Sequence, residues 1–122
     1  MVRGMRGATT VERNEKTEII AATQELLKMM IQENQVIAEN IAAIIFSSTP
    51  DLNSAFPAAS ARGIGLNEVP VFGTQEIDNP DGLPRCIRVL MLVNTEASSK
   101  EINHVYLREA VTLRPDLSES AS

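Results

Sequence analysis

The sequence predicts an α/β (α+β) domain, built from one mixed β-sheet and one long helix. Three observations lead to this prediction. One segment repeats apolar residues every three or four positions, which is typical of an amphipathic helix. Four or five other segments are short and apolar, which is typical of strands. The chain has 122 residues, a length that suits one domain around one core.

The first strand and the long helix are predicted from the start of the chain. Val2–Val11 is expected to be extended, with Gly4 and Gly7 marking a bulge or a close backbone approach. The helix follows, and we expect Asn14 to cap it and Asn34 to stop it in a left-handed conformation. Its buried stripe is predicted to consist of Ile19, Ile20, Thr23, Leu26, Leu27, Met30 and Ile31.

The middle of the chain predicts two further strands. Ile41–Ser47 is a continuous apolar run that indicates a buried strand, and Asp51–Ala61 indicates a loop with one or two helical turns. Val69–Thr74 is strand-like. Because Pro70 cannot donate a ladder hydrogen bond, this strand is expected at a sheet edge or strand entry. Asn79–Pro84 carries strong turn chemistry.

Arg85–Asn94 predicts the central strand. Its faces alternate, with Ile87, Val89, Met91 and Val93 on one side and Arg88, Leu90 and Leu92 on the other. Both faces are apolar apart from Arg88, so both are expected to be covered. One helix cannot cover both faces, and we therefore expect a closed homo-oligomer. Further on, Ser98–Asn103 is expected to form a short helical turn, and a strand is favoured for Ala110–Leu113.

Composition argues against several classes of function. The net charge of −5 offers no basic field for nucleic acid. The N-terminus lacks the apolar core of a signal peptide, and no apolar run is long enough to cross a membrane. Cys86 is the only cysteine and His104 the only histidine, so neither a zinc site nor another metal or cofactor site is expected. A single cysteine fits a cytoplasmic location.

Arginine dominates the basic residues. The chain has eight arginines and only three lysines among its 11 basic residues. Because a guanidinium group pairs well with planar carboxylates, an acidic protein rich in arginine can hold a small anion in a local basic pocket. The alternative is that these arginines simply lie on the solvated surface.

Arg88 is the strongest single candidate for a functional role. A charge within an apolar strand is costly unless an anion meets it. That anion is either a ligand or an acidic side chain of the same protein, and composition does not separate the two. Glu76 follows the strand Val69–Thr74, where a carboxylate can accept a proton, hydrogen-bond a hydroxyl, or serve as the partner of Arg88.

The other candidates are more ambiguous. Arg6 lies between two glycines and either reaches a ligand or belongs to a strand with a bulge. The Tyr106 hydroxyl can bind a carboxylate, although a tyrosine of the core is the alternative. His104 is expected to be structural, and Cys86 is expected to be a buried, inert thiol. No nucleophile–base pair is evident, so this set suits anion binding and charge stabilisation.

Five stretches taken together resemble the AroH-type chorismate mutases. They are, in order, VRGMRGATTVE, TPDLNSAFPAASAR, VPVFGTQEI, CIRVLML and HVYLREAVTLRPDL. The resemblance implies one chorismate mutase domain over residues 1–117, followed by a flexible C-terminal tail, 118–122. It also implies a homotrimer with a pseudo-α/β-barrel core, the Bacillus chorismate mutase-like fold, with active sites between subunits and no cofactor.

The family's reaction is the Claisen rearrangement of chorismate to prephenate in phenylalanine and tyrosine biosynthesis. By motif, the resemblance implies that Arg88 meets the ether oxygen, Glu76 contacts the ring hydroxyl, and Arg6 and Tyr106 hold a carboxylate. Other substrate-binding positions are implied for the pocket wall, at Phe56, Ala58, Val71, Phe72, Gly73 and Leu113. Two mobile arginines, Arg62 and Arg114, are implied to draw in and cover the substrate.

Two positions depart from the family pattern. The family often has Cys or Ser in place of Gly73 and Lys in place of Ala59, so a lower substrate affinity is expected here. Two rival functions remain open. One is another enzyme on the same trimeric architecture, such as an enamine/imine deaminase, against which the contexts of Arg88 and Glu76 argue. The other is a non-catalytic trimer that binds small anions, which Gly73 and Ala59 leave open.

Overall fold

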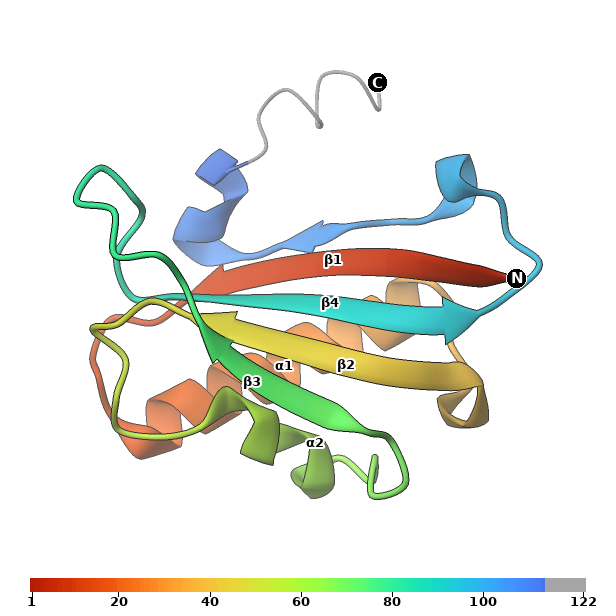
Figure 1. The fold of residues 1–122 in the computed structure, drawn as a ribbon, viewed down its shortest axis with the longest axis horizontal. Coiled ribbons are helices and arrows are strands. Elements are labelled where there is room, and N and C mark those ends of the chain that lie inside the picture. The colour runs from red at the N-terminus through yellow and green to blue at the C-terminus, as the bar shows by residue number, and fades with distance from the viewer. Residues whose placement is uncertain (114–122) are drawn as a thin grey trace.

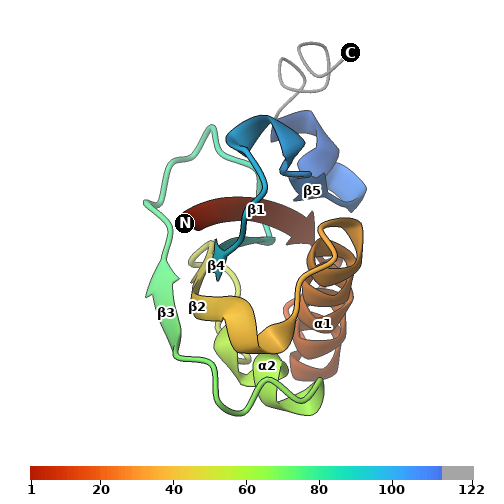
Figure 2. The same cartoon turned by 90° about the vertical axis from the view of Figure 1, so that its right-hand side faces the viewer.

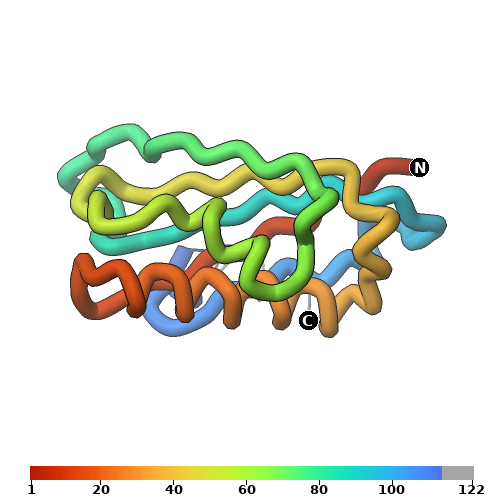
Figure 3. The backbone as a smooth tube through the Cα atoms, turned by 90° about the horizontal axis from the view of Figure 1, so that it is seen from below, coloured from red at the N-terminus to blue at the C-terminus, as the bar shows by residue number. Residues whose placement is uncertain are grey.

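The computed structural model describes residues 1–113, so Arg114 and the expected tail, 118–122, lie outside the described residues. Within them, five strands form one mixed sheet in the order β3-β2-β4-β1-β5. The helix α1 lies against one face of this sheet and runs along its strands (Figures 1, 2 and 3). The predicted fold class, a mixed sheet with one long helix, is confirmed.

The strands are β1 (Val2–Thr10), β2 (Ile41–Ser48), β3 (Val71–Gln75), β4 (Cys86–Asn94) and β5 (Val105–Tyr106). The α-helices of the described residues are α1 (Lys16–Glu33) and the short α2 (Ser60–Gly63). Single turns of 3₁₀ helix occur at Ala38–Asn40, Pro57–Ala59 and Ser99–Glu101, and a longer 3₁₀ segment covers Arg108–Leu113.

β4 occupies the centre of the sheet, as the sequence predicts. It pairs antiparallel with β1 on one side and with β2 on the other. The face that packs on α1 is fully buried and carries Ile87, Val89, Met91 and Val93. The opposite face is only partly covered, and the Arg88 side chain on it is 49% exposed. Because α1 lies on one side only, the chain itself does not supply the cover expected on the second face, and cover by a neighbouring subunit stays a prediction.

The buried face of α1 largely follows the predicted stripe. Its fully buried residues are Ile19, Ala22, Thr23, Leu26, Leu27 and Met30. Ile20 and Ile31, predicted as members of the stripe, are only half-buried. Ile31 nevertheless packs against the buried core.

Both predicted ends of this helix are wrong in detail. The cap residue is Glu15, with no side-chain cap hydrogen bond. Asn14 instead holds a neighbouring loop, since its Nδ2 donates to Asn53 Oδ1 (2.6 Å) and its Oδ1 accepts from the Ser54 amide (3.1 Å). At the other end Asn34 has a φ of −112°, so it is not left-handed. The left-handed residue is Gln35, with a φ of 52°.

The strands at the two edges of the sheet agree only in part with those predicted from the sequence. β3 pairs with β2 alone and begins just after Pro70, as expected for an edge strand. The predicted strand at Ala110–Leu113 is wrong, because these residues belong to a 3₁₀ segment. The Leu107 amide donates a backbone hydrogen bond to Ala8 O of β1 (2.9 Å), and Arg108 then takes a positive φ of 54° that ends the strand.

Gly7 serves the core. A Cβ at this position would lie 2.5 Å from Met30 Sδ, so glycine lets α1 approach β1 closely. The β1–β4 register runs without a shift, so the bulge considered for β1 is absent from this pair. The register shift of the described sheet lies in β2, between Ile41 and Ala43.

Candidate active site

A groove of about 470 Å³ lies on the face of the sheet opposite α1. Its lining residues come mainly from β1, β2, β4 and β5, and are Arg6, Gly7, Ala8, Ile45, Ser47, Arg88, Val89, Leu90, Tyr106 and Leu113. Three of the four predicted catalytic residues, Arg6, Arg88 and Tyr106, are among them. They are distant in the sequence, so the sheet is what brings them together.

The strand register explains how these side chains meet. Ala8 of β1 pairs with Arg88 of β4 and also with Tyr106 of β5. Tyr106, Ala8 and Arg88 therefore stand in one row across the three adjacent strands β5, β1 and β4. Neighbouring strands lie roughly 4.8 Å apart, so the backbones of Arg88 and Tyr106 are separated by roughly 10 Å. The small Ala8 side chain between them leaves room for a ligand.

Arg6 lies on the same face of the sheet, two residues before Ala8 on β1. It pairs with Leu90, two residues beyond Arg88 on β4, so its side chain projects to the groove side. Two cationic groups and a phenol thus surround a space with apolar walls. Such an arrangement can bind a small anion that also carries an apolar framework.

Glu76 reaches this site through Arg88. Arg88 Nε lies 3.7 Å from Glu76 Oε2, and the two side chains are 49% and 25% exposed. The Glu76 amide donates to Ser48 O (2.9 Å), which holds the residue at the end of β2. Glu76 lines a second depression of about 410 Å³, which Arg88 also lines. The expectation that Glu76 can serve as the partner of Arg88 is confirmed, and within one chain the Arg88 side chain is half-exposed.

The remaining predicted pocket residues lie elsewhere in the same chain. Phe56 and Ala58 lie just before α2 and Arg62 lies within it. Val71, Phe72 and Gly73 belong to the edge strand β3. None of these six lines the groove. Both phenylalanines are well exposed, Phe56 at 82% and Phe72 at 66%. A Cβ at Gly73 would meet no atom within 4 Å, so the position has space for a side chain.

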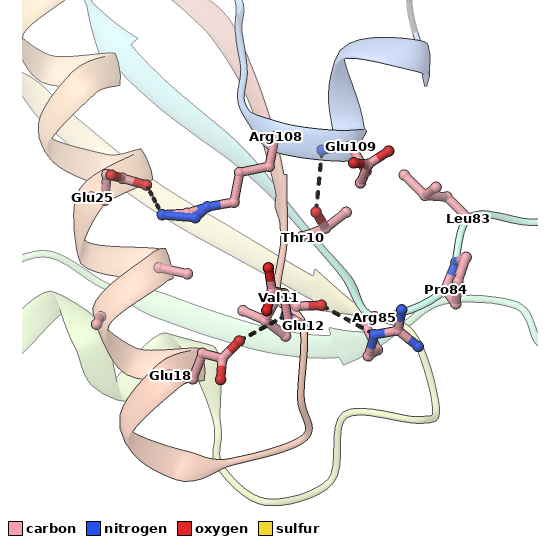
Figure 4. Close-up of a pocket in the computed structure, with 12 residues that line it drawn as sticks. Thr10, Val11, Glu12, Glu18, Glu25, Leu83, Pro84, Arg85, Arg108 and Glu109 are labelled. Atoms are coloured by element: carbon pink, nitrogen blue, oxygen red, sulfur yellow. Dashed lines mark hydrogen bonds and ion pairs between the residues drawn. The ribbon is translucent and has the colours of Figure 1, made fainter.

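A larger concavity, of about 950 Å³, lies between the start of α1 and the 3₁₀ segment Arg108–Leu113 (Figure 4). Its charged lining consists of Glu12, Glu18, Glu25, Arg85, Arg108 and Glu109. Arg108 is already paired with Glu25, at 2.9 Å. Four carboxylates against two guanidinium groups repel an anionic ligand. The smaller groove is therefore the better candidate site, despite its size.

Cys86 lies two residues before Arg88 and is buried, as expected. Burial raises the pKa of its thiol, and the nearby Arg88 guanidinium only partly opposes this shift. The thiol therefore stays protonated near neutral pH and is a poor nucleophile. Within residues 1–113, no three His, Cys, Asp or Glu side chains gather in a way that would hold a metal ion. In the same range no helix is both long and apolar enough to cross a membrane.

Several residues of the groove escaped the sequence analysis. Ala8, Ile45 and Ser47 line it, and Ser47 pairs directly with Arg88. The alternation of side chains along β1 predicts that Ala8 lies on the same face as Arg6. The register between strands cannot be predicted from the sequence of one strand alone, so the neighbours Ile45 and Ser47 could not be found in this way. His104, expected to be structural, contacts the backbone of Arg6.

Comparisons with known proteins agree on one family. Residues 2–117 match the family model described as chorismate mutase type I. The chain is 53% identical to "Chorismate mutase AroH" of Thermus thermophilus, over 99% of both chains. It is 48% identical to "Chorismate mutase AroH" of Bacillus subtilis (strain 168), over 97% of this chain and 94% of that one. A solved chorismate mutase from Clostridium thermocellum aligns with a TM-score of 0.89 and 46% identity, over 90% of this chain and 98% of that one. The chain therefore belongs to the type I chorismate mutase family.

Proposed function

We propose that this protein converts chorismate to prephenate in the groove lined by Arg6, Arg88 and Tyr106. The observation that carries the proposal is the convergence of these three side chains, from three strands, in a chain of this family. The two guanidinium groups give the groove a positive charge that attracts the dianionic chorismate, and the apolar wall suits its ring.

The reaction requires little chemical equipment. A carbon–oxygen bond breaks and a carbon–carbon bond forms within one molecule, so no group passes to the protein. Catalysis then needs two contributions, which are selection of the folded substrate conformer and stabilisation of developing charge. Neither contribution needs a nucleophile, a metal or a cofactor.

Arg88 supplies the second contribution. The ether oxygen gains negative charge as its bond to carbon breaks, and a guanidinium group there stabilises the transition state more than the ground state. A preorganised donor of this kind contributes roughly 3–4 kcal/mol. Glu76, 3.7 Å from Arg88 Nε, orients the guanidinium and accepts a hydrogen bond from the ring hydroxyl.

Arg6 and Tyr106 supply the first contribution. They stand on adjacent strands, so they can clamp one carboxylate between them while Arg88 faces the ether oxygen. The carboxylate is charged throughout the reaction, so this clamp acts mainly on substrate binding and orientation.

The site is completed by a neighbouring subunit. Phe56, Val71 and Phe72 are exposed apolar side chains, and clusters of this kind mark interaction surfaces. In the proposed homotrimer, the face that carries these residues and Ala58, Gly73 and Arg62 lies against the groove of the next chain. Leu113 completes the wall from the groove's own chain, and Arg114 covers the site. We further propose that residues 1–117 form one domain, and that the enzyme is cytoplasmic and needs no cofactor.

The test is direct. Purified protein at micromolar concentration is incubated with chorismate, and proton NMR follows the loss of chorismate and the appearance of prephenate. Conversion well above the uncatalysed rate is expected, with light scattering giving the mass of a trimer. Binding of chorismate without turnover would instead support an anion-binding protein. If chorismate were neither bound nor converted, the proposal would be refuted.

A further inference from the structure

The backbone of Arg6 is held by a side chain. Its amide donates a hydrogen bond to Nδ1 of His104, with a nitrogen–nitrogen distance of 3.0 Å. β1 and β5 pair over only two positions, Gly7 with Val105 and Ala8 with Tyr106. The imidazole of His104 therefore stands where the next residue of a longer β5 would offer a backbone acceptor.

This bond matters because β5 is so short. β1 is held against β4 over nine residue pairs, so the place of Arg6 relative to Arg88 rests on many hydrogen bonds. The position of Tyr106 relative to Arg6 depends on only a few hydrogen bonds. Beyond the pairing itself, β5 is tied to β1 by the Leu107 amide, at 2.9 Å from Ala8 O, and by His104 at the opposite end.

The segment before β5 has its own anchor. The Asn103 amide donates to Asn34 Oδ1, and Asn34 Nδ2 donates to Asn103 O, both at 2.8 Å. These bonds fasten the chain to the end of α1. The contact of His104 with Arg6 is thus separable from the general attachment of this segment.

We infer that His104 is a positioning residue, whose Nδ1 holds the Arg6 backbone in register with β5 and so sets the spacing of Arg6 and Tyr106. The inference rests on the proposed function, in which these two side chains clamp one carboxylate of the substrate. A nitrogen that accepts carries no proton, so the ring proton of neutral His104 is on Nε2.

The experiment compares two substitutions in the full-length protein. In H104N the amide oxygen lies about as far from the backbone as Nδ1 does, so it keeps an acceptor for the Arg6 amide. H104L has similar bulk but no acceptor. We expect H104L to raise KM for chorismate by about 5- to 10-fold with kcat within about twofold, and H104N to restore KM. Amide hydrogen exchange by NMR is expected to quicken at Arg6 in H104L and to stay slow in H104N.

Controls separate the possible failures. Asn34→Ala loosens the anchor of the same segment without touching Arg6, so a purely structural role predicts the same KM change there. Arg6→Ala tests the proposed function itself. If Arg6→Ala raises KM while H104L leaves KM and Arg6 exchange unchanged, only the role of His104 is overturned. If Arg6→Ala leaves KM unchanged, the carboxylate clamp fails and the inference falls with it. Should H104L not fold, H104A is expected to show the same KM rise.

Discussion

Arg88 Nε lies 3.7 Å from Glu76 Oε2, although Arg88 belongs to the central strand β4 and Glu76 follows the edge strand β3. The two residues meet across the end of β2, whose Ser48 carbonyl accepts from the Glu76 amide. Exposed ion pairs of this kind stabilise a fold by at most about 1 kcal/mol. The value of the pair therefore lies in orienting the guanidinium group.

Glu76→Gln tests how far the rate depends on this carboxylate. Glutamine keeps a hydrogen-bonding oxygen but loses the charge. The contact with a ring hydroxyl exists in both the ground state and the transition state, so its loss acts mainly on KM. Because Glu76 also orients the Arg88 guanidinium, we expect kcat to fall by about tenfold, well below the loss in Arg88→Ala. Steady-state kinetics at saturating chorismate measure both variants. Equal losses would show that the ranking of the two residues is wrong.

Arg62→Ala tests whether a second chain completes the groove. Arg62 is exposed in the last turn of α2 and does not line the groove of its own chain. We expect KM to rise by about 3- to 10-fold with kcat unchanged, since a carboxylate is charged throughout the reaction. Lys28→Ala, an exposed charge on α1, is the control and is expected to leave KM unchanged.

Mixing subunits sharpens this test. Arg88→Ala chains still carry Arg62, and Arg62→Ala chains still carry Arg88. If a site is shared between neighbours, refolding the two variants together restores a component with the KM of the unmodified protein. Activity equal to the sum of the separate variants would place the whole site within one chain.

Thr49 is expected to secure the start of β4. Its Oγ1 accepts from the Cys86 amide (3.0 Å) and donates to Asp51 Oδ1 (2.5 Å). Thr49→Val has a similar shape but leaves a partly buried amide without this partner, which costs about 1–3 kcal/mol of unfolding free energy. Thr49→Ser keeps the hydroxyl and is expected to lose much less. Urea unfolding compares them, and equal stabilities would refute the role of the hydroxyl.

Glu18 is expected to make stability fall in acid. The Glu12 amide, which donates to Glu18 Oε1 at 2.7 Å, is the largest cause that holds the pKa of this carboxyl below its usual value, and Arg13 adds to it. A lowered pKa in the folded state means that the stabilisation is full above the ordinary pKa of 4.5 and is lost as pH falls through the folded pKa. Glu18→Gln should therefore flatten the acid limb of Tm against pH, measured by circular dichroism. Glu68 is an exposed loop carboxylate, and Glu68→Gln should leave the acid limb of Tm against pH unchanged. An equal flattening in Glu68→Gln would refute the specific role of Glu18.

The features of the fold that depend on local pattern were predictable. The period of α1 and the alternation of β4 each arise from which side chains a single element must bury. The helix ends were not predictable, because Asn14 bonds a loop nearly forty residues away, at Asn53 and Ser54. The 3₁₀ segment at Arg108–Leu113 depends on a positive φ at Arg108, which an arginine does not signal.

The candidate site was less accessible from local reasoning. Arg88 was predictable because a charge in an apolar strand needs an anionic partner. Glu76 was predictable as one candidate for that partner. The alignment of Arg6, Arg88 and Tyr106 depends on the registers of β1 with β4 and β5, which are set by packing. Only the resemblance to the family's motifs indicated from the sequence that these three residues belong to one site. Arg88 is half-exposed within one chain because α1 covers only the opposite face of β4, as expected when one helix packs on a sheet.

The central claim is that Arg88 stabilises the charge that develops on the ether oxygen of chorismate. The most direct measurement is kcat of Arg88→Ala at saturating chorismate, with light scattering and circular dichroism on the same sample. We expect kcat to fall at least about a hundredfold while mass and fold are unchanged. A kcat near that of the unmodified protein, or a loss that appears only because the chains no longer assemble, would contradict the account.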